Sequence, residues 1–395
     1  MLANATAPPP PQQVHAKCLS HNQTELNVWL SGAASDEEQG PLVSKRRKWA
    51  VQRKGCNWAT CLAEGNGEWK SNYSRPLYAK LSPDRFIANF NASKYFWGHC
   101  GVKRYDHAWV PTCKCDFPRP MDLVADFLDQ FAGKHVLFVG DSVHGQFFTS
   151  LAHILGFTSS EEGVGGCPDP RPFMPHGLFW SHIYPSCRQP FVQTGKCKSA
   201  RLRGEQPHAH EFDMRVRTPG PTLQYLRNEA LVSVDAYPPN RTRYMCRWLP
   251  AASEADVIVL HKAHHDDNVT TLQASLSALD AARKPGATMV FIGAHSARCS
   301  QCVLEGKLTI DSVLAADAVM AKYNYQRLPE FNRVARKLTE SYARSLYLDV
   351  FTASHANGKH RFSAPMDCLH QCLPGPIDQW SLLLMALLLS ERPDN

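Results

Sequence analysis

The stretch HVLFVGDSVHGQFFTSLAHIL, from His135 to Leu155, decides the fold that this sequence predicts. Its first part, His135–Val139, is a short apolar run, which is typical of a buried strand. Gly140 and Asp141 end that run, and from Ser142 onward apolar residues recur at helical spacing. We therefore expect Ser142 on a tight turn between the carboxyl end of a strand and the N-terminus of a helix.

The chemistry of such a turn favours a nucleophile at Ser142. Backbone N–H groups without partners collect at a helix N-terminus, and they favour negative charge there. An acyl-transfer intermediate needs donors of this kind for its oxyanion, which places Gly140 and Asp141 in the expected oxyanion site. The alternative is that Asp141 and Ser142 only cap the helix.

Further strands and helices alternate along the rest of the chain. We expect strands at 230–234, 256–260, 288–292 and 346–350, and helices at 121–131, 272–279 and from Pro329 onward. This alternation predicts an α/β fold in which a mostly parallel sheet is covered by helices on both faces. Ser142 then lies at the carboxyl edge of the sheet, where active sites of such folds are found.

Composition divides the chain into three parts. Residues 1–55 are rich in proline and polar residues, which predicts a linker or stem. Residues 56–118 hold five cysteines and many aromatic residues, which predicts a small disulfide-rich N-terminal lobe. Residues 119–395 carry the expected catalytic domain, with an irregular insertion at about 159–222.

Cysteine content and charge indicate a compartment and exclude some partners. The chain has 14 cysteines spread along its length, and its N-glycosylation motifs begin at Asn4, Asn22, Asn72, Asn91, Asn240 and Asn268. Both features favour the secretory pathway, with most cysteines in disulfides. A net charge of +7 is too weak to predict nucleic-acid binding. Because no apolar run reaches membrane-spanning length, we expect membrane attachment only through an N-terminal anchor that this sequence does not include.

A second motif, DCLHQCLPGPIDQW at Asp367–Trp380, supplies the partners that a serine nucleophile needs. On a helical turn the three-residue spacing of Asp367 and His370 puts both side chains on one face. The carboxylate of Asp367 can then orient the imidazole of His370, whose other nitrogen faces the serine hydroxyl. We expect Ser142, Asp367 and His370 to form a catalytic triad.

Together the two motifs resemble those of a known family. Gly140-Asp141-Ser142 with a late Asp-x-x-His is similar to the SGNH/GDSL hydrolase superfamily. The C-terminal motif resembles the signature of the plant trichome-birefringence-like, or PC-esterase, family at every position except one, where Gln371 replaces a tryptophan. The resemblance runs roughly from Cys56 to the end of the chain, with a poorly matched middle.

The resemblance implies an SGNH-like α/β/α sandwich and O-acetyltransfer onto cell-wall polysaccharides in the Golgi lumen. It implies that Ser142 is the nucleophile, His370 the general base and acid, and Asp367 the residue that orients His370. No bound cofactor or metal is expected, and the acetyl donor is a co-substrate.

The sequence departs from the family in two places near the expected site. After Ser142 the family continues x-x-Arg-Asn-Gln, whereas this chain continues to Gln146 without the Arg-Asn pair. The family's Asn-x-Gly-His-Trp is replaced by His261-Lys262-Ala263-His264-His265, which keeps only His264. We expect Gln146, His261 and His264 in the oxyanion or substrate site, with His261 as a hydrogen-bond donor in place of the asparagine.

Three other functions fit parts of the sequence. A carbohydrate acetylesterase needs the same triad with water as acceptor, and a catalytically inactive polysaccharide-binding protein would fit the lost Arg-Asn pair. A metal hydrolase could use His264, His265, Asp266 and Asp267 with Cys299 and Cys302. Four ligands in a row rarely converge on one ion, so this last alternative is the weakest.

Overall fold

The computed structural model describes residues 17–18, 57–71, 107–112, 120–155, 197–199, 213–217, 220–232, 244–296, 302–303, 307–308, 322–354, 369, 371 and 376–391. Its centre is a six-stranded sheet in the order β13-β10-β9-β4-β7-β6. The strands are β4 (His135–Gly140), β6 (Asp213–Arg217), β7 (Thr222–Arg227), β9 (Val257–His261), β10 (Thr288–Ile292) and β13 (Ser345–Leu348). All neighbours pair in parallel except β6, which runs antiparallel to β7 at one edge.

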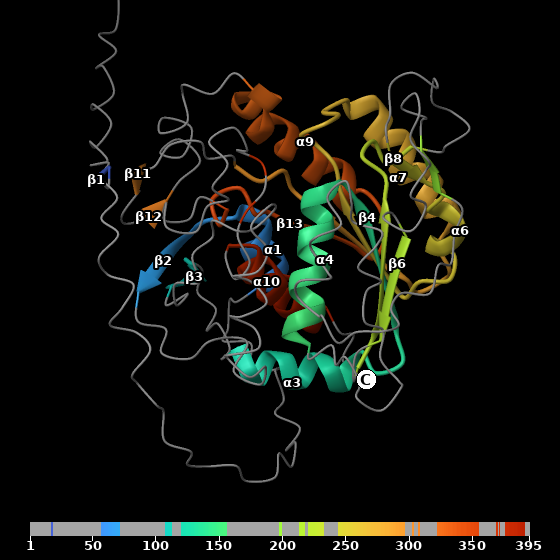
Figure 1. The fold of residues 1–395 in the computed structure, drawn as a ribbon, viewed down its shortest axis with the longest axis horizontal. Helices are drawn as coiled ribbons and strands as arrows, with labels where there is room; N and C mark the ends of the chain where they lie inside the picture. Colours follow the sequence, from blue (N-terminus) through green and yellow to red (C-terminus); the bar gives the residue numbers. More distant parts are fainter. Residues whose placement is uncertain are drawn as a thin grey trace, which may run out of the picture.

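Helices cover both faces of this sheet. On one face lie α3 (Pro120–Gln130), α4 (Ser142–Ile154) and α10 (Pro376–Ser390), which contact one another. The other face carries α6 (Leu249–Ala252), α7 (Val269–Ala282) and α9 (Leu328–Glu340), the last preceded by the 3-10 turn η5 (Lys322–Arg327). Figure 1 shows α4 and α10 on one side of the strands and α6 and α7 on the other. The predicted α/β sandwich with a mostly parallel sheet is therefore confirmed.

Covering both faces explains the sequence of the central strands. Val136, Leu137, Phe138 and Val139 of β4 are fully buried, and all five residues of β9 are buried as well. A strand that meets helices on both sides has no solvated face, so it reads as a continuous apolar run. This is why the strands at 135–139, 256–260 and 288–292 could be predicted to within a residue of their ends.

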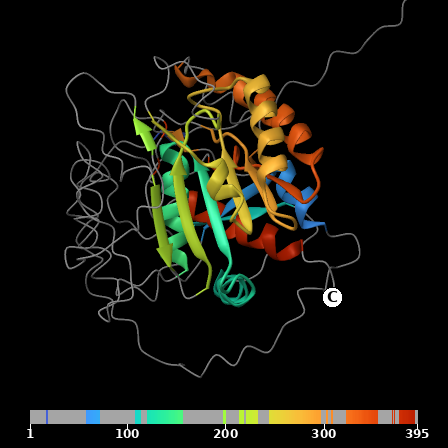
Figure 2. The same cartoon turned by 90° about the vertical axis from the view of Figure 1, so that its right-hand side faces the viewer.

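The order of the strands places the end of β4 at a switch point. The chain leaves β4 through α4 to β7 on one side, and later builds β9, β10 and β13 on the other side. Helices that connect β4 to strands on one side of it lie on one face of the sheet, and helices that connect to strands on its other side lie on the opposite face. This arrangement leaves a crevice at the carboxyl end of β4. Ser142 is two residues beyond the end of β4, at this switch point. Figure 2 shows β4 between the yellow-green strands β6 and β7 on one side and the later strands of the sheet on the other.

The strand predicted at 230–234 was wrong where the structure describes it. Residues 230–232 are a turn and an irregular segment, in which Leu231 has a positive φ of 55°, whereas the strand lies upstream at β7. The insertion expected at 159–222 stays a prediction; its described residues include the edge strand β6 and the short β5 (Cys197–Ser199), which pairs with β8 (Tyr244–Cys246). The alternating polar and apolar residues of DMRVR suit an edge strand, but they lie in an otherwise irregular, proline-rich sequence.

The described part of the predicted N-terminal lobe packs directly on the α/β unit. It consists of α1 (Trp58–Glu64), β2 (Gly67–Ser71) and β3 (His107–Pro111), with β12 (Lys307–Leu308) as a third strand beside β2. The backbone N–H of Asp349 donates to the carbonyl of Leu62, and that of Trp109 donates to Oε1 of Gln379. These bonds fix α1 beside β13 and β3 beside α10.

Several cysteines lie opposite one another on paired strands. Cys197 is the register partner of Cys246, and Cys18 of β1 (Lys17–Cys18) is that of Cys302 in β11 (Cys302–Val303). Cys61 is disulfide-bonded. That most of the 14 cysteines form disulfides stays a prediction, because the others fall outside the described residues. Among the described residues, no helix is both long enough and apolar enough to span a membrane.

Candidate active site

Ser142 occupies the position that its sequence predicted. It is the first residue of α4, directly after the carboxyl end of β4, and its side chain is partly exposed. Oδ1 of Asp141 accepts hydrogen bonds from the backbone N–H groups of Val143 (3.0 Å) and His144 (3.1 Å), which caps the helix. The capping residue Asp141 and the candidate nucleophile Ser142 are thus neighbours, so a capping role for this turn does not exclude a catalytic one.

Asp141 is a buried carboxylate beside the serine. Its second oxygen, Oδ2, has no hydrogen-bond partner and lies 3.9 Å from Nε2 of His261. Burial by itself raises the pKa of Asp141, whereas positive charge on the nearby histidines, with His261 foremost, lowers it, and the net direction is downward. Asp141 therefore places a negative charge next to Ser142. The hydroxyl of Tyr225 also donates to the carbonyl of Asp141 at 2.6 Å, which fixes the turn.

The C-terminal motif reaches the same turn of α4. Nε2 of Gln146 donates to the carbonyl of Gln371 at 2.8 Å, and the N–H of Gln371 donates to Oε1 of Gln146 at 3.3 Å. Gln146 lies one helical turn after Ser142, so this pair of bonds holds the motif against the helix that begins with Ser142. Asp367 and His370 themselves lie outside the described residues, and their roles stay predictions.

The end of the same motif anchors α10. Oδ1 of Asp378 accepts a hydrogen bond from the hydroxyl of Ser150 in α4 at 2.5 Å, and Ser381 lies 3.0 Å from the same hydroxyl. The ring of Trp380 packs edge-on against Phe147 of α4. These contacts explain why polar residues of the motif occur in a helix that is otherwise apolar and buried.

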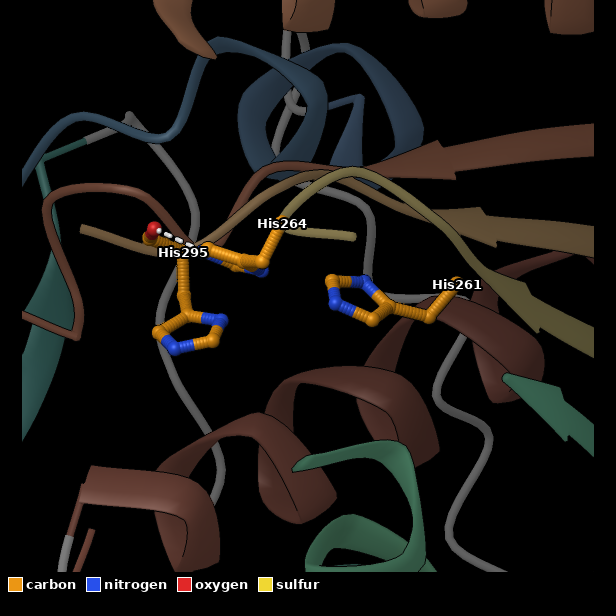
Figure 3. Close-up of side chains that lie close together, drawn as sticks. All are labelled: His261, His264 and His295. Carbon is orange, nitrogen blue, oxygen red and sulfur yellow. Dashed lines mark hydrogen bonds between the residues drawn. The ribbon is translucent and has the colours of Figure 1, made fainter. Parts of the chain in front are cut away.

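Three buried histidines meet beside Asp141. His261 ends β9, His264 follows in the next loop, and His295 follows the neighbouring strand β10 (Figure 3). One ring nitrogen of each lies within 4.8 Å of those of the other two. Each ring also bonds a backbone carbonyl: His261 Nδ1 that of Ile292 (3.2 Å), His264 Nε2 that of His295 (3.0 Å) and His295 Nε2 that of Leu369 (3.0 Å).

These bonds determine what the rings offer to the site. A carbonyl can only accept, so the nitrogen that bonds it carries the hydrogen, and in a neutral ring the other nitrogen is an acceptor. Burial lowers the pKa of His264 to about 3 and holds that of His295 well below its usual value. Nδ1 of His261 bonds the carbonyl of Ile292, so its Nε2 is the nitrogen that faces Asp141, and the role of His261 as an oxyanion donor stays a prediction.

A fourth histidine, His144, stands behind this group. Its Nε2 donates to the carbonyl of Val259 at 3.0 Å, and its ring stacks on that of His261 with 5.7 Å between centroids. Burial lowers the pKa of His144 to about 3. The His144 ring is therefore neutral, and its hydrogen bond joins the start of α4 to β9.

The structure brings together Gly140, Asp141, Ser142, Gln146, His261 and His264 from the predicted site. Sequence reasoning missed His144 and His295. His295 stands three residues after a predicted strand, and that position was the signal which could have found it. The four consecutive residues of the metal-hydrolase alternative diverge: Asp266 pairs with Lys262 at 3.0 Å and Asp267 with Arg327 at 3.7 Å, while His264 joins the histidine group.

Comparison with known proteins gives matches of three kinds. Residues 338–387 match the PC-esterase family, described as a GDSL/SGNH-like acyl-esterase family found in Pmr5 and Cas1p. The resemblance to this family is confirmed. The chain is also 30% identical over 138 residues to protein trichome birefringence-like 39 of Arabidopsis thaliana. That match covers 35% of this chain and about a third (32%) of the relative's length.

A solved structure titled "Peptidoglycan O-acetylesterase in action, 5 min" is similar over 70% of this chain and 97% of its own. The TM-score is 0.38 and the sequence identity 11%.

Proposed function

We propose that the protein is an O-acetyltransferase that transfers acetyl groups to polysaccharide hydroxyls through an acetyl-Ser142 intermediate. One observation carries the proposal: Ser142 begins α4 at the carboxyl end of β4, and Gln146, one helical turn later, binds the backbone of the motif that contains His370. The acyl-esterase family that matches residues 338–387 supports acyl-ester chemistry in this chain.

In the proposed reaction His370 takes the proton of the Ser142 hydroxyl as the oxygen attacks the acetyl carbonyl of the donor. The leaving group of the donor receives that proton, and an acetyl ester remains on Ser142. His370 then takes a proton from a sugar hydroxyl as its oxygen attacks the acetyl-serine. The bond between the acetyl group and the Ser142 oxygen breaks, and His370 returns the proton to that oxygen. Asp367 orients the imidazole, and the positive end of the α4 helix dipole, next to Ser142, favours both oxyanions.

The proposal also specifies the substrate class and the cellular compartment. The polysaccharide belongs to the cell wall or matrix, and the reaction takes place in the Golgi lumen, in keeping with the predicted disulfides and glycosylation motifs. The protein needs an acetyl donor as co-substrate and neither binds nucleic acid nor uses a bound cofactor in this step. An N-terminal anchor outside the given sequence would hold it at the membrane.

A panel assay tests the proposal. Purified protein is incubated with an acetyl donor and with oligosaccharides of xylan, mannan and pectin, and the masses of protein and sugars are followed. A transferase adds acetyl to a sugar and to the Ser142 peptide, whereas an esterase removes acetyl from acetylated oligomers. Binding without either change would identify an inactive binding protein and refute the proposal.

Two serine variants make the assay specific. Ser142→Ala abolishes both the acetyl-peptide and the acetylated sugar if the intermediate is real. Ser277→Ala changes an exposed serine on α7, far from the carboxyl edge of β4, and keeps full activity. Equal transfer by the Ser142→Ala protein would exclude the covalent mechanism.

A further inference from the structure

The histidine group holds more acceptors than it can use among its own residues. His261 Nε2, His264 Nδ1, His295 Nδ1 and Asp141 Oδ2 are all buried, and none of the four atoms has a hydrogen-bond partner. A buried acceptor without a partner costs about 1–3 kcal/mol. Four such atoms in one place indicate that something outside the chain binds them.

The orientation of the rings identifies the kind of ligand. Each imidazole bonds a backbone carbonyl through one ring nitrogen and turns its other nitrogen inward. Histidines that bind metals almost always show this arrangement, because the outer hydrogen bond fixes the ring and makes the inner nitrogen more basic. Three ring nitrogens and a carboxylate oxygen that converge in this way suit an electron-pair acceptor.

A single water molecule would satisfy these atoms less well than a cation. One water donates only two hydrogen bonds, whereas three imidazole nitrogens and a carboxylate oxygen await a partner. A divalent cation accepts a lone pair from each imidazole at once, and its charge offsets that of Asp141.

We propose that His261, His264 and His295 form a binding site for a Zn²⁺ ion. Imidazole is a preferred zinc ligand, and three histidines with a fourth, open position are a common zinc set. The ligand nitrogens lie within 4.8 Å of one another, so the rings draw slightly inward to reach Zn–N bonds of about 2.0–2.1 Å. Oδ2 of Asp141, 3.9 Å from His261, faces the site as a nearby negative charge.

The ion would tie together the carboxyl end of β9, the loop after it and the segment after β10, in addition to the bonds that His261 and His264 already make there. The site itself does not depend on the proposed acetyl transfer, because binding can be measured without any substrate.

The test measures metal binding by the full-length protein. The protein is freed of metal with a chelator, reloaded with Zn²⁺ and desalted, and its metal content is determined by mass spectrometry. We expect about one Zn²⁺ per chain, and X-ray absorption of the bound ion shows nitrogen or oxygen neighbours with imidazole features. Sulfur neighbours would assign the zinc to cysteines and overturn the proposal, as would a wild-type protein that retains no zinc.

Variants locate the ion. His264→Gln and His295→Gln each remove one ligand and weaken Zn²⁺ affinity by about 100-fold or more in competition with a chromophoric chelator. His265→Gln changes the exposed histidine next to His264 and leaves affinity unchanged. If the ligand variants bind zinc as tightly as the wild type, the site is elsewhere. If they fail to fold, the X-ray absorption of the wild-type protein decides.

Ser142→Ala separates this proposal from the proposed function. The variant keeps its Zn²⁺ whether or not Ser142 is a nucleophile, because Ser142 offers no ligand to the group. Loss of acetyl transfer with retained zinc supports both proposals. Full zinc binding by a wild-type protein that transfers no acetyl group leaves the zinc site standing and refutes only the proposed function.

Discussion

The clearest prediction concerns Gln146, the residue that holds the C-terminal motif against α4. Gln146→Met keeps an unbranched side chain of similar length and removes both hydrogen bonds to the backbone of Gln371. The helix itself stays intact, because methionine is a good helix former. The expected effect is therefore on the docking of the motif, and only secondarily on the fold.

The magnitude follows from the two bonds. Each contributes about 0.5–1.5 kcal/mol net, so their joint loss weakens docking by about 2 kcal/mol. Since 1.4 kcal/mol corresponds to a factor of ten, the ratio of docked to undocked motif falls by about 30-fold. If His370 acts from this motif, kcat/KM falls by up to the same factor. Gln146→Glu keeps the acceptor for the N–H of Gln371 and should fall between the wild type and Gln146→Met.

The assay combines kinetics with amide hydrogen exchange. We expect the Gln146→Met protein to show a lower kcat/KM for acetyl transfer and faster exchange at the amide of Gln371. Gln379→Met is the matched control, because Gln379 accepts one bond from the N–H of Trp109 away from Ser142. It should lower stability without accelerating exchange at Gln371. Unchanged exchange and unchanged kcat/KM in Gln146→Met, or an equal loss of activity in Gln379→Met, would refute the reasoning.

Three further predictions follow from individual contacts. Ser142→Ala should change the free energy of unfolding by less than about 1 kcal/mol in urea titration, while acetyl transfer falls by orders of magnitude. A large loss of stability would contradict this. Gly140→Ala would place the new Cβ 2.7 Å from Cβ of His144, so we expect the free energy of unfolding to fall by about 1–3 kcal/mol and acetyl transfer to be reduced. Wild-type stability of this variant would show that the turn adapts. Burial raises the pKa of Asp349 from 3.8 to about 6, so the folded state binds its proton more tightly, and the stability from this group is present below about pH 4 and lost by about pH 6. Asp349→Asn keeps an acceptor for the N–H of Phe351 and should gain up to about 3 kcal/mol over the wild type between pH 4 and pH 7 in urea titrations; a constant difference across that range would show that Asp349 is not the titrating group.

Local pattern was enough to predict much of the framework. The buried strands at 135–140, 257–261 and 288–292 are continuous apolar runs, because helices cover both of their faces. The turn at Ser142 follows from the end of one run and the start of a helical period.

Strands that are less enclosed by neighbouring elements were not predicted from the sequence. β6 lies at the edge of the sheet, and β7 pairs with it on one side. Their sequences, DMRVR and TLQYLR, mix charged and apolar residues. From the sequence, a strand is instead predicted at the apolar residues 230–234, downstream of β7. Contacts with β4, which is distant in the sequence, decide which segment of the chain pairs with the sheet.

By itself, the sequence determined that Ser142 stands between a buried strand and a helix, since both elements are set by local hydrophobic spacing. Only the tertiary structure decided that His261, His264 and His295 meet beside Asp141. His261 pairs in register with Ile292, so the ends of β9 and β10 bring together residues that lie more than 30 positions apart in the chain. Strand order and register arise from long-range packing of the whole sheet, and no local pattern records them.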